Sequence, residues 1–149
     1  MTSRDPAFVV NVEVFLHRGG RWLLIRRGDA EAHAAGTLAG VGGKVEAPAL
    51  GPEVLEATAR REVREEIGVA LDGVPLLYAD SSFFIADDGD QVVNVVFVAQ
   101  FPDDARPAVV SPEEVSEIVW LTASEVKADQ TCPPWIQRSL AQADTVRAA

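Results

Sequence analysis

Three glutamates lie within five residues of one another, at Glu62, Glu65 and Glu66. At about 100° per residue, a helix places Glu65 roughly 60° to one side of Glu62 and Glu66 roughly 40° to the other. All three carboxylates therefore share one face, where like charges at these spacings repel weakly. A hard divalent cation reverses that penalty, because Mg²⁺ binds carboxylate oxygens and keeps positions open for phosphates. The spacing predicts a divalent-metal site.

The same segment has a second interpretation. Residues 61–66 read Arg-Glu-Val-Arg-Glu-Glu, and Arg61 can pair with Glu65 one helical turn away. Taken alone, the segment is more typical of a solvated helix face. Its context favours the metal site, since a Gly-Gly-Lys turn at 42–44 lies upstream and Glu53 stands at the start of the same helix.

The elements that must position these side chains follow from the apolar pattern. Helix-forming residues run unbroken from Glu53 to Ile67, after Pro52 and before Gly68, and predict a helix of about four turns. Runs rich in Val, Phe and Leu predict strands, and Thr122 and Pro134 begin two further helices. The expected strands are 7–16 paired with 22–25, 74–85 paired with 91–101, and 118–121. This order predicts an α/β fold with a mixed sheet packed between helices.

The composition narrows the classes of protein. The 149 residues fit one domain, and 48% hydrophobic with 24% charged residues exclude a disordered chain. A net charge of −10 excludes duplex nucleic acid and anionic membranes as partners. No apolar run approaches the roughly 18 residues of a membrane span. The single cysteine, Cys132, and a start without a signal-peptide profile predict a cytoplasmic protein.

Residues 38–69 resemble the box of the Nudix hydrolases, which runs Gly, five residues, Glu, seven residues, Arg-Glu-apolar-any-Glu-Glu-any-Gly-apolar. Here Glu53 is followed after seven residues by Arg-Glu-Val-Arg-Glu-Glu-Ile-Gly-Val, a complete match to that half. Nine residues, not five, separate Gly43 from Glu53. A longer surface loop costs little entropy, so we expect the extra residues to bulge outward.

The resemblance implies a fold, a reaction and a metal. The fold is the Nudix-type α/β/α sandwich, as a single Nudix hydrolase domain over 1–149. The reaction is hydrolysis of the pyrophosphate linkage in a nucleoside diphosphate linked to another moiety, with Mg²⁺ or Mn²⁺ as cofactor. Glu62 and Glu66 become the main metal ligands, Glu65 a further ligand, and the Gly42 carbonyl the backbone ligand.

The resemblance also implies supporting roles. Arg61 would pair with Glu53 and hold the helix to the loop. Lys44, Arg26 and Arg27 are candidates to contact phosphate, with ordinary exposed cations as the alternative. Some family members take a general base or last ligand from an acidic loop before a Trp-bearing strand. Three acids match that loop, and Glu117 is favoured over Glu113 and Glu114.

The substrate and the partners rest on weaker signals. The chain lacks the downstream Pro and Tyr of ADP-ribose and dinucleoside polyphosphate enzymes, since Ile85 and Asp87 stand there. It therefore looks most like the MutT-like enzymes that act on (deoxy)nucleoside triphosphates or oxidised nucleotides. The alternatives are an ADP-ribose, nucleotide-sugar or dinucleoside polyphosphate hydrolase, and a non-catalytic nucleotide sensor. Family members are commonly dimers, so a homodimer is an open alternative to a monomer.

Two residue types are expected to serve structure only. At least three of the five aromatic residues Trp22, Phe83, Phe84, Trp120 and Trp135 are expected in the core. Both histidines, His17 in a predicted turn and His33 in a loop, are expected in solvent because no cysteine stands at metal-ligand spacing.

Overall fold

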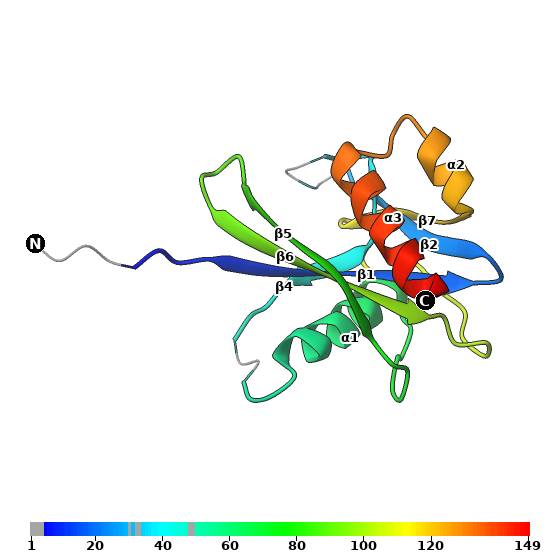
Figure 1. The fold of residues 1–149 in the computed structure, drawn as a ribbon, viewed down its shortest axis with the longest axis horizontal. Coiled ribbons are helices and arrows are strands. Elements are labelled where there is room, and N and C mark those ends of the chain that lie inside the picture. The colour runs from blue at the N-terminus through cyan, green and yellow to red at the C-terminus, as the bar shows by residue number, and fades with distance from the viewer. Residues whose placement is uncertain (1–4, 30, 32–33, 48–49) are drawn as a thin grey trace, which may run out of the picture.

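The computed structural model describes residues 5–29, 31, 34–47 and 50–149. Within these residues one mixed sheet of seven strands forms the centre of the molecule (Figure 1). The strands are β1 (Val9–Arg18), β2 (Arg21–Arg27), β3 (Leu38–Ala39), β4 (Val41–Lys44), β5 (Leu77–Ile85), β6 (Gln91–Gln100) and β7 (Val115–Leu121). The order along the main path is β3-β2-β1-β6-β5, with β4 paired to β1 and β7 paired to β2.

Strand β1 lies at the middle of the sheet and explains its mixed character. Its second half pairs antiparallel with β2 through a tight turn, and its first half pairs antiparallel with β4. Along its other edge it pairs in parallel with β6, which the chain reaches only after α1 and β5. Val12, Val14 and Phe15 of this strand are fully buried.

Helices cover both faces of the sheet. Helix α1 (Val54–Ile67) packs against β4 and β1, whereas α3 (Pro134–Ala148) packs against β5 and β6. The two helices lie on opposite sides of the strands in Figure 1. The short α2 (Ala123–Ala128) begins with the expected capping box of Thr122 and Glu125. These layers confirm the predicted α/β/α order.

The boundaries of α1 follow from its flanking residues. The helix begins after Glu53, whose backbone is left-handed at φ 57°, and ends at Gly68, which is left-handed at φ 70°. Ala59, Val63 and Ile67 are fully buried against the sheet. The predicted start at residue 53 is therefore one residue early. In the described part of the chain, no helix is both long enough and apolar enough to cross a membrane.

The expectation for the aromatic residues is wrong. Trp22 is buried and Trp120 packs partly buried against the core. Phe83, Phe84 and Trp135 are 53%, 49% and 63% exposed. The two phenylalanines are exposed because β5 ends the sheet, and no local pattern distinguishes an edge strand from a central one.

The expectation for His17 is also wrong. It lies in β1, partly buried, with its ring edge-to-face to Trp22 at 5.3 Å between centroids. Burial lowers its pKa, and the nearby positive charge of Arg147 lowers it further. His33 lies outside the described residues.

Candidate active site

Glu62 and Glu66 lie one turn apart on the face of α1 that meets β4. Both are buried, with 9% and 5% of their surface exposed. The backbone N–H of Gly42 donates a hydrogen bond to Oε2 of Glu66 at 3.0 Å. The strand thus holds one of the two carboxylates in place.

Two glycines of β4 permit this close approach of helix and strand. A Cβ atom at Gly43 would overlap the carboxylate of Glu62, and one at Gly42 would overlap the carbonyl oxygen of Val12. Any side chain at these positions would push the helix or β1 away. The Gly-Gly pair is therefore required by packing at the carboxylates.

The site carries more negative charge than its surroundings balance. Burial raises the pKa of Glu62 to about 7, although the neighbouring guanidinium of Arg61 opposes the shift. Burial also raises the pKa of Glu66 to about 8, and the charge of Glu62 raises it further against the Gly42 hydrogen bond. A cation between the two carboxylates would stabilise their ionised forms.

The donor atoms present fit a magnesium-like ion. In an antiparallel strand, the N–H and C=O of one residue leave the same edge, so the Gly42 carbonyl lies on the edge that faces Glu66. No three His, Cys, Asp or Glu side chains converge as a closed metal cage within the described residues. Mg²⁺ is usually held by one or two carboxylates, waters and substrate phosphates, and it needs no such cage. Glu65 is exposed beside the pair, and its charge raises the pKa of Glu62.

Arg61 connects the helix to the segment that follows β4, but through partners other than Glu53. Its guanidinium donates to the backbone oxygen of Lys44 at 2.9 Å and contacts Glu62 at 3.1 Å and Glu46 at 3.7 Å. In this structure Arg61 makes no hydrogen bond or ion pair with Glu53, which lies just outside the N-terminal end of α1. Sequence reasoning did not consider Glu46, two residues after Lys44, as a partner of Arg61.

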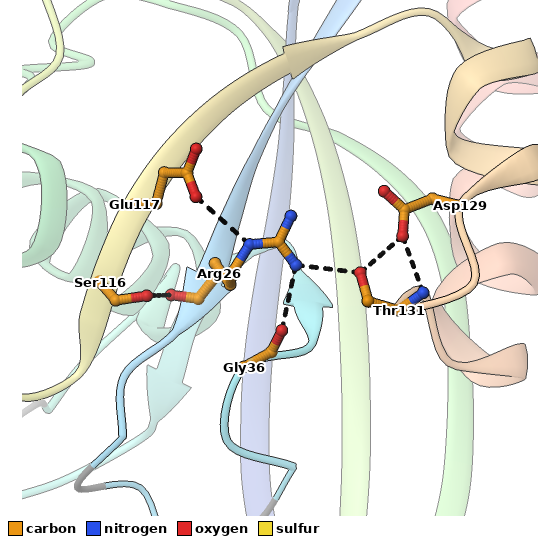
Figure 2. A network of polar contacts seen from close by, with 6 residues as sticks. All are labelled: Arg26, Gly36, Ser116, Glu117, Asp129 and Thr131. Atoms are coloured by element: carbon orange, nitrogen blue, oxygen red, sulfur yellow. Dashed lines mark hydrogen bonds and ion pairs between the residues drawn. The ribbon is translucent and has the colours of Figure 1, made fainter.

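The cations proposed for phosphate contact differ in their surroundings. Arg26 donates to Oε2 of Glu117 at 3.3 Å, to Gly36 at 3.0 Å and to Thr131 at 2.9 Å, as Figure 2 shows. Arg27 pairs with Glu31 at 3.0 Å. The Lys44 side chain is exposed at the end of β4.

In the acidic segment before β7, Glu114 acts electrostatically on the buried carboxylates, whereas Glu117 pairs with Arg26. Glu117 of β7 lies opposite Arg26 of β2, and its carboxylate forms an ion pair with that arginine. The charge of Glu114, in contrast, raises the pKa of both Glu62 and Glu66. The backbone oxygen of Glu114 accepts a hydrogen bond from Gly28 at 2.8 Å, which fixes the segment to the end of β2.

A buried carboxylate that sequence reasoning missed lies behind the glycine-rich strand. Glu13 of β1 accepts hydrogen bonds from the N–H of Gly40 at 3.0 Å and from Nδ2 of Asn94 at 3.4 Å. Asn11 donates to Oδ1 of Asn94 at 2.7 Å. Burial raises the pKa of Glu13 against these bonds. The network fixes the backbone that enters β4, and the apolar run around Glu13 was its only sequence signal.

Together, the layers and the site define a class of protein. In this α/β/α sandwich, a helix holds a pair of buried carboxylates against a glycine-lined strand, an arrangement whose oxygen donors suit a hard divalent cation. The family model described as the NUDIX domain matches residues 7–142. The chain belongs to the Nudix family, which confirms the resemblance seen in the box.

Individual relatives support this membership. The chain is 34% identical over 117 residues to the uncharacterized Nudix hydrolase YfcD of Escherichia coli strain K12, a match that covers 77% of this chain and 59% of that protein. The chain thus spans about three fifths of the length of this curated relative.

Solved structures agree on the fold. A MutT NUDIX hydrolase from Burkholderia pseudomallei matches with a TM-score of 0.75 at 27% identity, covering 93% of this chain and 98% of that one. The NUDIX domain of NrtR from Shewanella oneidensis, solved with ADP ribose, matches with a TM-score of 0.71 at 20% identity, covering 97% and 89%. The second likeness concerns the fold alone.

Proposed function

We propose that this chain hydrolyses the pyrophosphate linkage of a nucleoside diphosphate joined to another moiety, with a divalent metal as cofactor. The observation that carries the proposal is the buried pair Glu62 and Glu66 held against Gly42. Membership of the Nudix family and the likeness to a MutT NUDIX hydrolase support it.

Glu62, Glu66 and the Gly42 carbonyl are the groups that would hold Mg²⁺ or Mn²⁺, with Glu65 as a further ligand. When bound, such an ion neutralises the pyrophosphate charge and lowers the pKa of water. The protein's part is to position these oxygens. The Gly42 amide fixes Glu66, and Arg61 fixes Glu62 while it binds the backbone of Lys44.

The remaining polar groups would orient the substrate. Lys44 is exposed at the end of β4 and is the candidate for direct contact with phosphate oxygens. Arg26 and Arg27 would contact phosphate by exchanging their present carboxylate partners Glu117 and Glu31. We propose Glu114, rather than Glu117, as the acid that completes the site, because its charge reaches both buried carboxylates.

The finer parts of the proposal concern the substrate and the setting. The absence of the two downstream signature residues favours a (deoxy)nucleoside triphosphate or an oxidised nucleotide over ADP-ribose, nucleotide sugars and dinucleoside polyphosphates. The proposed unit is one hydrolase domain over residues 1–149 acting on a small molecule in the cytoplasm.

The test is phosphate release with Mg²⁺ and with Mn²⁺ across these five substrate classes, using coupled phosphatase or pyrophosphatase. Glu66→Gln keeps the shape and an acceptor for the Gly42 amide but removes the charge, so it should abolish turnover. Glu56→Gln, in the first turn of the same helix, is the matched control and should retain full activity. Full activity in Glu66→Gln would overturn the metal assignment. Nucleotide binding without any turnover would support the sensor alternative.

A further inference from the structure

Four polar side chains form a row across the sheet, one from each of four neighbouring strands. Lys44 of β4 lies opposite Asn11 of β1, Asn11 lies beside Asn94 of β6, and Asn94 lies opposite Ser82 of β5. Register partners on neighbouring strands project from the same face of a sheet. These four residues, which we call the polar row, therefore share one face.

The polar row lies on the face of the sheet that carries α3. Glu13 stands two residues after Asn11 and shares its face, and both Glu13 and Asp80 are register partners of Val96. Asp80 pairs with Arg138 of α3 at 3.4 Å. The row is thus on the opposite side of the sheet from α1.

An aromatic side chain stands next to the polar row on this face. Figure 1 shows the turn between β5 and β6 extending beyond α3, and Ser82 and Phe84 follow Asp80 toward that turn. Phe84 is 49% exposed and lies opposite Val92, which is two residues from Asn94 and on the same face. Successive rows on one face are about 6.6 Å apart, and side chains stand roughly perpendicular to the sheet. A flat ring standing on the polar row would therefore pack against Phe84.

The hydrogen bonds within the row leave a donor and an acceptor available on Asn11. Nδ2 of Asn11 donates to Oδ1 of Asn94 at 2.7 Å, and Nδ2 of Asn94 donates to Oε1 of Glu13 at 3.4 Å. Glu13 thus orients the Asn94 amide, which in turn orients that of Asn11. Asn11 is partly exposed, so its Oδ1 and its second N–H are presented side by side. The Ser82 hydroxyl makes no side-chain hydrogen bond within the described part of the chain.

We propose that the polar row binds the nucleobase of the substrate. The edge of the base lies on Asn11 and Ser82, and its ring face packs against Phe84. The inference rests on the proposed function, since it places the base of a nucleotide whose pyrophosphate lies at Glu62 and Glu66. The base it selects carries an adjacent hydrogen-bond donor and acceptor on one edge, to match the amide of Asn11.

The distance from the proposed cation site suits a nucleoside. Strand β4 pairs with β1, and β1 pairs with β6. Neighbouring strands lie about 4.8 Å apart, so the backbone of Asn94 is about 10 Å from that of β4. Gly42, which holds Glu66, belongs to β4. The phosphate end of a nucleotide would therefore lie at β4 and its base two strands away, with the exposed Lys44 between them.

The residue types of the row favour a base over other substrate groups. Asn94 is 9% exposed, in a strand whose other buried residues are all apolar. An apolar group bound here would cover the amides without supplying hydrogen-bond partners, which costs free energy. A second phosphate would need several cations, and Lys44 is the only cation of the row.

The first experiment measures binding by calorimetry, with Mg²⁺ and the α,β-methylene analogues of the four common ribonucleoside triphosphates. The control ligand is the methylene analogue of tripolyphosphate, which has no base. Phe84→Ala should weaken binding of the preferred nucleotide by about tenfold, as expected for a lost stacking contact. Phe83→Ala is the matched control, because Phe83 is 53% exposed and lies on the opposite face of the same strand. It should change binding by less than about twofold, and neither variant should affect the base-free ligand.

The second experiment measures specificity as a ratio of kcat/KM on one protein sample. The preferred nucleotide is compared with its analogue lacking the exocyclic group at purine position 6 or pyrimidine position 4. The unaltered chain should favour the complete base by about tenfold or more, because a missing partner leaves the Asn11 amide unpaired. Asn11→Ala should reduce this ratio to within about twofold. Ser82→Ala should lower it in part, whereas Ser81→Ala, on the other face, should leave it unchanged.

Three results would each overturn the proposal. They are equal binding of the nucleotides and the base-free ligand, equal effects of Phe84→Ala and Phe83→Ala, and an unchanged ratio in both Asn11→Ala and Ser82→Ala. The binding experiment needs no turnover. Nucleotide binding that depends on Phe84 in a protein that hydrolyses none of these nucleotides would thus support the polar row and overturn only the proposed hydrolysis.

Discussion

The Gly43 backbone and the Glu62 carboxylate lie in direct contact, with no room between them for a single methyl group. Helix α1 therefore sits as near to β4 as its carboxylates allow. This contact sets the position of both buried acids relative to the strand. The geometry of the site therefore depends on the glycine as much as on the acids.

Gly43→Ala should consequently impair both stability and turnover. Overpacking of this kind costs about 1–3 kcal/mol, measurable by urea unfolding. Adding Glu62→Ala should recover part of the stability, because it removes the overlapping carboxylate, but should leave the protein inactive. A double-mutant cycle without coupling between these two changes would contradict the contact.

The stability of the metal-free protein should fall as the pH rises. Glu62 and Glu66 have folded-state pKa values raised to about 7 and about 8, above their ordinary value of 4.5. The folded state thus binds more protons than the unfolded state in this range. Its extra stability is complete below pH 4.5 and is lost as the pH passes through 7 and 8.

The measurement is chemical unfolding in EDTA between about pH 5 and pH 9. The decline should be shallower in Glu66→Gln, which cannot ionise, and unchanged in Glu56→Gln. Saturating Mg²⁺ should restore stability at the alkaline end, because a ligand that binds only the folded state stabilises it. An identical pH profile in Glu66→Gln would show that other groups cause the decline.

Glu114→Gln and Glu117→Gln should separate the two candidates for the last acid. We expect Glu114→Gln to lower kcat by about tenfold to a hundredfold, in the range of a lost positioned acid or base. Glu117→Gln should leave kcat within about twofold of the unaltered protein, because it changes only a partly exposed ion pair with Arg26. Glu113→Gln serves as the control. The reverse order of effects would return the role to Glu117.

Arg61→Lys tests whether a planar guanidinium is needed at the base of the helix. Arg61 contacts the Lys44 backbone and the Glu62 carboxylate at once, which a single ammonium group does poorly. The side chain is about one-third exposed, so we expect a loss of about 1 kcal/mol of stability. Thermal unfolding would detect it. Glu53→Gln should have no comparable effect on stability.

The sequence was most informative where local chemistry decides the structure. The helix predicted from Glu53 to Ile67 spans Val54–Ile67, because Pro52 and Gly68 bound it and its apolar residues repeat at helical spacing. The five strands expected from apolar runs form in the expected order along the chain, whereas the short β3 and β4 lie in a glycine-rich segment that no such run marks.

Partners fixed by tertiary packing were beyond local reasoning. Whether Glu114 or Glu117 approaches the buried carboxylates depends on how β7 pairs with β2. That pairing includes an irregularity between Arg26 and Arg27. The partner of Arg61 depends on the course of the chain after Lys44. The exposure of Phe83 and Phe84 depends on β5 being the last strand of the sheet.

The raised pKa values of Glu62 and Glu66 mean that the proposed cation site also holds protons. Near neutral pH both carboxyls are partly protonated when no ion is bound. Loading an ion must therefore release protons to the buffer. Acidity and cation concentration then compete for the same oxygen atoms, so a mildly acidic medium acts as an inhibitor of loading.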